Sequence, residues 1–130
     1  MEYKIIKNDT NYNLDDLTKL LNTSYWAKDR KKETVKKTVE NSLCYFAYDK
    51  DKLIGFARAI TDYPTNYYIC DVIVDEEYRG EGIGKKLVET LIHDEDLLHV
   101  RGLLITKDAK KFYEKFGFYN KEDVMQKDKK

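Results

Sequence analysis

Hydrophobic residues recur with a helical period near the start of the chain and in alternating or continuous runs further along it. A short strand is predicted over residues 3–7. Two helices are predicted next, one capped by Asn13 and one beginning after Arg30. The leucines on one face of the first helix are Leu14, Leu17 and Leu21.

Three strands are predicted in the middle of the chain, over residues 43–48, 53–61 and 67–75. The polar residues 49–52 join the first two as a hairpin, and Pro64 interrupts the chain before the third. Successive side chains of a strand point to opposite faces. In the third strand this alternation places one set of side chains on one face (Tyr68, Cys70, Val72, Val74) and the other set on the opposite face (Tyr67, Ile69, Asp71, Ile73).

The last part of the chain alternates predicted helices and strands. A glycine-rich turn precedes a helix from Ile83, and a strand over residues 103–106 follows. A helix over 109–116, ended by Gly117, and a short strand over 118–120 complete the pattern. The predicted order is β-α-α-β-β-β-α-β-α-β. It indicates an α/β fold (α+β, with a mixed sheet) that has helices on both faces.

The length of 130 residues suits one domain over residues 1–120, followed by a short charged tail over residues 121–130. Lys and Arg number 24, as do Asp and Glu, so the net charge is zero. This balance argues against a nucleic-acid binder and against a polybasic membrane contact. The first residues lack the apolar segment of a signal peptide, and no apolar run is long enough to span a membrane. We therefore expect a cytoplasmic protein.

The segment with the most chemical information is the glycine-rich turn Arg79–Lys85, between an apolar strand and an amphipathic helix. A helix N-terminus exposes unpaired N–H groups and a partial positive charge. Glycine at positions 80, 82 and 84 removes the Cβ atoms that would keep a phosphate away from those donors. The turn therefore predicts an anion site, and we expect its ligand to carry a diphosphate.

Four interpretations of this turn compete. A P-loop requires Ser or Thr after its lysine, but Lys86 stands at that place and the glycine spacing differs. A dinucleotide-binding fingerprint requires G-x-G-x-x-G, one residue longer than the spacing of Gly80, Gly82 and Gly84. A coenzyme A pyrophosphate site and a turn without any ligand are the other two.

The turn resembles the R/Q-x-x-G-x-G/A motif of the GNAT superfamily of N-acetyltransferases. A second segment, Phe112–Phe118, is similar to the family's helix-to-strand segment, in which a tyrosine precedes a glycine–aromatic pair. The order of predicted elements also matches the family over almost the whole chain. The resemblance therefore implies the GNAT acyl-CoA N-acyltransferase fold and acetyl-CoA as co-substrate.

The resemblance also implies roles for individual residues. The backbone of Val72–Val74 would pair with the pantetheine arm, and the N–H groups of Arg79–Lys85 would hold the pyrophosphate. Tyr113 matches the tyrosine that protonates the departing thiolate, and Thr106 stands where the family often has an asparagine that contacts coenzyme A. The implied cofactor-binding residues are Val72, Ile73, Val74, Arg79, Gly80, Gly82, Ile83, Gly84, Lys85 and Thr106.

Acetyl transfer also requires a general base that deprotonates the amine. The candidates are acidic residues near the positions that would bind the cofactor. Asp71 is the first candidate, because a desolvated carboxylate in an apolar strand has a raised pKa. A structural aspartate bonded to backbone donors is the alternative. Asp62 is the second candidate, and a chain of water molecules is a third route for the proton.

The acceptor site is expected at the loop between the first two helices. Tyr25 and Trp26 form either an exposed aromatic pair that binds an apolar part of the substrate or a helix-packing cluster. Arg58 lies in an apolar strand and needs a partner, which is either an acid of the protein or a carboxylate of the substrate. Asp71 is a plausible internal partner, and this pairing would lower the pKa of Asp71 and weaken its claim as the base. The basic run Lys28–Lys37 is expected to be a solvated helix face.

Cys44 and Cys70 lie in apolar stretches and are expected to be reduced core residues. The spacing of His93 and His99 fits no metal motif, so no metal is expected.

The residues and the resemblance together predict an N-acetyltransferase that moves the acetyl group of acetyl-CoA to a primary amine of a small molecule or a protein. The alternative is a regulatory module that binds coenzyme A without turnover. Dimers are common in this superfamily, so the resemblance also makes a homodimer one of the expected assemblies.

Overall fold

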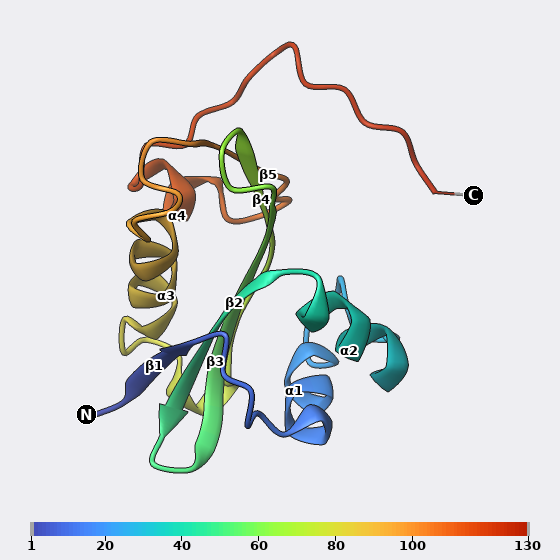
Figure 1. The fold of residues 1–130 in the computed structure, drawn as a ribbon, viewed down its shortest axis with the longest axis vertical. Coiled ribbons are helices and arrows are strands. Elements are labelled where there is room, and N and C mark those ends of the chain that lie inside the picture. The colour runs from blue at the N-terminus through green and yellow to red at the C-terminus, as the bar shows by residue number, and fades with distance from the viewer. Residues whose placement is uncertain (1, 130) are drawn as a thin grey trace.

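The computed structural model describes residues 2–129 and contains one five-stranded sheet with helices on both faces (Figure 1). Met1 and Lys130, the outer limits of the expected domain and tail, lie outside the described residues. The elements in chain order are β1 (Lys4–Lys7), α1 (Leu14–Leu21), α2 (Lys32–Glu40), β2 (Leu43–Asp49), β3 (Lys52–Thr61), β4 (Asn66–Val74), the 3-10 helix η1 (Glu76–Tyr78), α3 (Ile83–Ile92), β5 (Arg101–Leu104) and α4 (Lys110–Glu114).

The strands lie in the order β1-β2-β3-β4-β5. The pairs β1–β2, β2–β3 and β3–β4 are antiparallel, whereas β4 and β5 are parallel. A parallel pair needs a long crossover connection, and the segment containing α3 supplies it. The predicted mixed sheet is therefore confirmed, as is the hairpin between β2 and β3.

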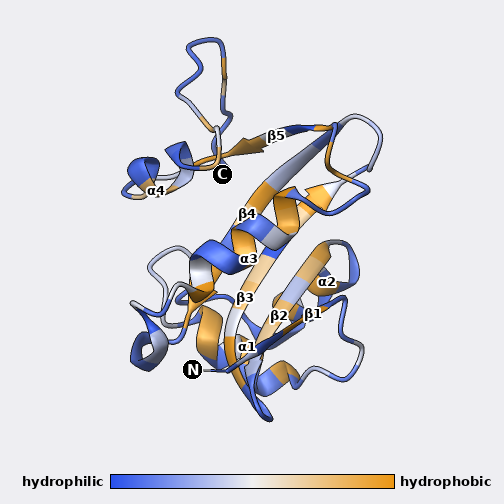
Figure 2. Ribbon diagram, turned by 90° about the vertical axis from the view of Figure 1, so that its left-hand side faces the viewer, coloured by the Kyte–Doolittle hydropathy of each residue, from blue (hydrophilic) through white to orange (hydrophobic). Residues whose placement is uncertain are grey.

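Helices α1 and α3 each pack on the sheet through one apolar face. The Asn13 side chain caps α1 by accepting a hydrogen bond from the Asp16 N–H, and Leu17 and Leu21 are buried in the core on this face. On the opposite face α3 buries Leu87 and Leu91. Figure 2 shows hydrophobic and hydrophilic segments alternating along α3. None of the helices within residues 2–129 is long and apolar enough to cross a membrane.

A β-bulge in β4 divides this strand into two parts. Arg58 of β3 faces Asp71, but the next residue, Ala59, faces Ile69, so Cys70 has no opposite partner. Before the bulge Ile69 packs in the core beneath α3, and after it Ile73 packs in the core beneath α1. The predicted alternation therefore holds within each half of β4. It is wrong for the strand as a whole, because the extra residue at Cys70 exchanges the two faces.

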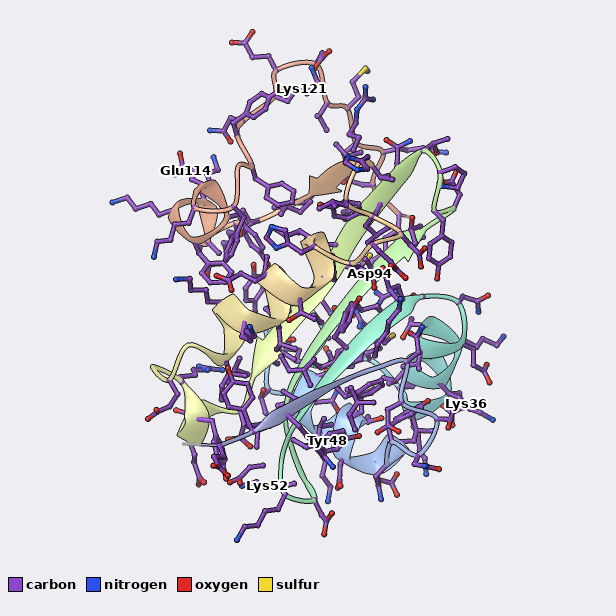
Figure 3. The ribbon with its side chains drawn as sticks, turned by 60° about the vertical axis from the view of Figure 1, so that its left-hand side comes forward. Lys36, Tyr48, Lys52, Asp94, Glu114 and Lys121 are labelled. Atoms are coloured by element: carbon purple, nitrogen blue, oxygen red, sulfur yellow. The ribbon has the colours of Figure 1, made fainter. Side chains whose placement is uncertain are left out.

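The end of the chain differs from the sequence prediction. Helix α4 is shorter than expected, although Gly117 has the predicted left-handed backbone with φ of 91°. The strand expected over residues 118–120 is absent, and residues 118–129 contain neither helix nor strand. They extend beyond β5 at the end of the molecule where Figure 3 labels Glu114 and Lys121, opposite Lys52.

A polar cluster fastens the C-terminal end of α3 to the first two strands. The Asp94 carboxylate accepts a hydrogen bond from the buried Tyr45 hydroxyl and lies 2.7 Å from Lys7 Nζ. Burial would raise the pKa of Asp94, but its bonds to Lys7 and Tyr45 outweigh burial and lower that pKa. Figure 3 shows Asp94 just beyond α3, beside the sheet.

Close packing of α3 on β3 generates a prediction at Gly55. A Cβ atom there would lie 3.1 Å from Leu87 Cδ1 and 3.3 Å from Ile83 Cγ2. We expect Gly55→Val to lower the free energy of unfolding by about 1–3 kcal/mol through overpacking. Urea unfolding measures this change. Ile60→Val, at an exposed position of the same strand, is the control and should change the value by less than about 0.5 kcal/mol.

Candidate functional site

The second half of β4 has an open hydrogen-bonding edge. Strand β5 pairs with β4 only over Asn66–Ile69, and no other strand within residues 2–129 pairs with this edge beyond Ile69. The Asp75 N–H bonds to the Ile54 carbonyl of β3, so by alternation the backbone groups of Val72 and Val74 point to the open side. The open side therefore offers backbone donors and acceptors to an extended ligand.

The glycine-rich turn lies at the end of this edge. Gly80 and Gly82 have φ of 86° and 79°, a backbone conformation that glycine adopts without steric cost. Gly82 is the N-cap of α3, so the first N–H groups of the helix point out of its end. The Arg79 Nε donates to the Val74 carbonyl at 3.2 Å, which joins the turn to the open edge.

A groove of about 640 Å³ contains most of the expected site residues. The open edge of β4, the glycine-rich turn, the loop between α1 and α2, and α4 all line it. The predicted residues that it brings together are Val72, Ile73, Val74, Arg79, Gly80, Gly82, Ile83, Gly84, Lys85, Tyr25, Trp26 and Tyr113.

Thr106 is not among the residues that line this groove. It lies instead in a second hollow between β5 and α4, and its hydroxyl accepts a hydrogen bond from the Ala109 N–H at 3.0 Å. The hydroxyl therefore supports the start of α4, a local role typical of threonine before a helix.

Tyr113 lies on α4 with its ring against those of Phe112 and Phe118. Burial raises the pKa of Tyr113 to about 12. The phenol therefore stays protonated at neutral pH and can act as a proton donor.

Asp71 is 1% exposed, and both of its carboxylate oxygens carry hydrogen bonds. Oδ1 accepts from Trp26 Nε1 at 2.8 Å, and Oδ2 accepts from Arg30 Nη1 at 2.9 Å and Arg58 Nε at 2.7 Å. Burial alone would raise the pKa of Asp71, but the two guanidinium groups outweigh burial and lower it. Of the two alternatives for Asp71, the structure thus shows the pairing with Arg58 and the lowered pKa, and not the raised pKa of an unpaired, desolvated carboxylate. A carboxylate with a lowered pKa is a weak general base.

Arg58 has the internal partner that the sequence left open. Its side chain is buried against Asp71, and its Nη1 also donates to the Ser42 hydroxyl at 3.1 Å. The contact of Arg30 with Asp71 was not predicted, because Arg30 lies in the basic run Lys28–Lys37 that was expected to be a solvated helix face. The available signal was its residue type: it is the only arginine in a run of lysines, and arginine is favoured for buried ion pairs.

Tyr25 and Trp26 are 55% and 42% exposed, as expected of a pair at a binding site. Their rings meet edge to face at 5.2 Å, and Lys107 Nζ lies 5.4 Å from the Tyr25 ring centroid. This ammonium–ring contact connects the loop to the segment before α4.

Asp62 lies away from the groove, in the turn between β3 and β4. Its carboxylate accepts from the backbone N–H groups of Thr65 and Asn66 and from the Thr65 hydroxyl, which lower its pKa. It therefore stabilises the turn. Residues 2–129 contain no group of three or more metal-ligating side chains, and Cys44 and Cys70 are free thiols, the first buried and the second half-buried.

Sequence comparisons identify a family and its members. A model described as an acetyltransferase (GNAT) domain matches residues 40–120. The uncharacterized N-acetyltransferase ycf52 of Gracilaria tenuistipitata var. liui is 33% identical over 118 residues, which are 85% of this chain and 64% of that protein. GCN5-related N-acetyltransferase 2, chloroplastic, of Arabidopsis thaliana is 43% identical over 70 residues, which are 52% of this chain and 27% of that protein. The chain thus spans less than two thirds of the length of either relative.

Solved structures agree with the sequence comparisons. A Xanthomonas campestris pv. campestris protein described as belonging to the GNAT family superposes with a TM-score of 0.89 at 28% identity, over 98% of this chain and 93% of that one. An aminoglycoside 6'-N-acetyltransferase complexed with coenzyme A superposes with a TM-score of 0.60 at 29% identity, over 68% of this chain and 52% of that one.

The lowered pKa of Asp71 predicts how stability depends on pH. An aspartate whose pKa is lower in the folded state stabilises the fold above its unfolded pKa, about 3.9, and loses this contribution as the pH falls through its folded value. Asp71→Asn should therefore cost about 3 kcal/mol near neutral pH, because two buried guanidinium groups lose their counter-charge. Urea unfolding of both proteins between pH 7 and pH 3 should show this difference shrinking below about pH 4. A difference that stays constant over this range would contradict the assignment.

Proposed function

Because the chain belongs to the GNAT acetyltransferase family, we propose that it moves the acetyl group of acetyl-CoA to a primary amine of a small molecule or a protein. The observation that carries this proposal is the convergence of three features in one groove: the open edge of β4, the glycine-rich N-terminus of α3 and the protonated Tyr113. Acetyl-CoA would supply the acetyl group as a thioester.

The groove residues fit the parts of this co-substrate. The backbone groups of Val72 and Val74 would pair with the amides of the pantetheine arm, as one strand pairs with another. The first N–H groups of α3 would bind the pyrophosphate, with Arg79 and Lys85 adding positive charge. Gly84 supports this placement, because neither its backbone conformation nor a protein neighbour within 3.5 Å requires glycine there. A Cβ atom there would make ordinary contacts, 3.6 Å from Val74 Cγ2 and 4.0 Å from Phe112 Cζ, so a bound ligand would account for the glycine where protein packing does not.

The chain supplies two groups for acetyl transfer. A backbone N–H on the open edge, which the alternation assigns to Val74 rather than Ile73, would polarise the thioester carbonyl. Tyr113 would donate its hydroxyl proton to the sulfur as the carbon–sulfur bond breaks and the nitrogen–carbon bond forms. The proton lost by the amine would pass to water, because the Asp71 carboxylate has a lowered pKa and accepts hydrogen bonds on both oxygens, and water would return a proton to Tyr113.

The acceptor would enter beside Tyr25 and Trp26, at the end of the groove that faces the loop between α1 and α2. Nothing in the proposal requires a nucleic acid, a membrane or a metal. The cytoplasmic location and the homodimer remain predictions from the sequence.

Gly84→Ala tests whether the turn binds the co-substrate. The new Cβ would meet Val74 Cγ2 at 3.6 Å, an ordinary contact, so folding stability should stay unchanged or rise by up to about 1 kcal/mol. The affinity for coenzyme A measured by calorimetry should fall about tenfold, because the methyl group intrudes on the ligand. Lys86→Ala is the control, since Lys86 does not line the groove, and it should change the affinity less than about twofold. Equal affinity in Gly84→Ala and the original protein would contradict this placement.

Tyr113→Phe tests the proposed proton donor and separates turnover from binding. We expect kcat to fall about a hundredfold while the Kd for coenzyme A changes little, because only the hydroxyl is removed. Release of free thiol from acetyl-CoA in the presence of primary amines measures kcat. Binding of coenzyme A without turnover of any amine by the original protein would favour the alternative, a regulatory module.

A further inference from the structure

One buried carboxylate joins the loop between α1 and α2 to the strand that carries the open edge. Of the three side chains that donate to Asp71, two come from this loop, Trp26 and Arg30, and one from β3, Arg58. The Asp71 side chain is fully buried, whereas the Arg30 side chain is 19% exposed. A hydrogen bond to a charged partner is roughly twice as strong as a neutral one, so this carboxylate holds the loop firmly.

Hydrogen bonds within the loop connect its residues to one another, so the contacts that Trp26 and Arg30 make with Asp71 position the whole segment. The Asn22 side-chain amide donates to the Ala27 carbonyl at 2.8 Å and to the Arg30 carbonyl at 3.2 Å. The Ser24 hydroxyl accepts from the Ala27 N–H at 3.1 Å and donates to the Leu21 carbonyl at 2.7 Å. These hydrogen bonds cross-link residues 22–30, and Asp71 connects this segment to β4.

The bulge at Cys70 explains why Asp71 reaches the loop. Because the extra residue exchanges the faces of β4, Asp71 points to the side of α1 and α2 and not to the side of α3. Asp71 is also the residue directly before the open edge Val72–Val74. The loop is thus positioned from the same strand that would hold the pantetheine arm.

The contacts continue from the carboxylate across the groove. Trp26 bonds to Asp71, Tyr25 packs edge to face on Trp26, and the Lys107 ammonium lies over the Tyr25 ring. Lys107 belongs to the segment directly before α4, which carries Tyr113. These contacts therefore connect three walls of the groove at its acceptor end.

We propose that Asp71 is a positioning residue that acts through Trp26 and Arg30 to hold the loop as the wall of the acceptor site. The proposal rests on the proposed function, since it assigns the acceptor to this end of the groove. The indole N–H is occupied by Asp71, so Trp26 offers its ring, and not a hydrogen-bond donor, to the acceptor. Asp71 itself takes no proton during the reaction.

A pair of aromatic variants tests this role. Trp26→Phe keeps an aromatic ring but removes the donor to Asp71, whereas Tyr63→Phe removes a hydroxyl from an exposed side chain of the turn between β3 and β4, which does not line the groove. With the primary amine that the original protein acetylates fastest, Trp26→Phe should raise the amine KM about tenfold. The KM for acetyl-CoA should change less than about twofold, as should both KM values in Tyr63→Phe. An unchanged amine KM in Trp26→Phe would overturn the proposal.

The pH–rate profile distinguishes a positioning residue from a base. Asp71→Asn should lower kcat/KM for the amine and leave the acidic limb of the profile where it is in the original protein. Disappearance of that limb, with coenzyme A binding intact, would identify Asp71 as the base and overturn the proposal. If Asp71→Asn does not fold, Arg30→Gln removes one loop donor while the Arg58–Asp71 pair remains, and it should raise the amine KM in the same direction as Trp26→Phe.

A third measurement needs no turnover. Trp26 is the only tryptophan, so fluorescence quenching by acrylamide reports on this loop alone. We expect the quenching constant to rise about twofold in Arg30→Gln and in Asp71→Asn, because the loop is released. Unchanged quenching in folded variants would overturn the proposal. If the original protein acetylates no amine, the proposed function fails, and the quenching result still decides whether Asp71 holds the loop.

Discussion

Strand β4 separates from β5 partway along its length, and the site depends on this separation. A strand inside a sheet normally has both edges paired, so it offers no backbone groups to a ligand. Here β5 ends its pairing at Ile69, and the bulge at Cys70 turns the rest of β4 away. One edge of Val72–Val74 is left open, while the other edge stays fixed to β3. The same bulge aims Asp71 at the loop between α1 and α2, so the proposed cofactor edge and the proposed acceptor wall both depend on it.

Much of this arrangement could be predicted from the sequence because it has a local cause. The cap at Asn13, the hairpin at residues 49–52 and the left-handed Gly117 each follow from a few adjacent residues. The glycine-rich turn is local too, since its glycines and the helix after it are contiguous. The groove therefore contains nearly all of the residues expected from that segment and from the resemblance.

The features that sequence reasoning missed depend on partners far apart in the chain. The bulge at Cys70 is defined only by the register with β3, and no periodicity within β4 shows it. The environment of Asp71 required knowing that Arg30, 41 residues away in sequence, reaches it. The sequence offered Arg58 as one partner of Asp71, but it gave no sign that a second guanidinium and an indole N–H also bond to this carboxylate. Thr106 matched a motif position, yet its hydroxyl is used by the adjacent backbone.

The walls of the groove come from distant parts of the chain: the loop before α2, the end of β4 with the turn after it, and α4. Helix α4 begins at Lys110, so the wall that carries Tyr113 is synthesised after the other two walls. The ion pair between Lys7 of β1 and Asp94 likewise forms only after α3 has been synthesised. All five strands therefore leave the ribosome before the last wall of the groove does.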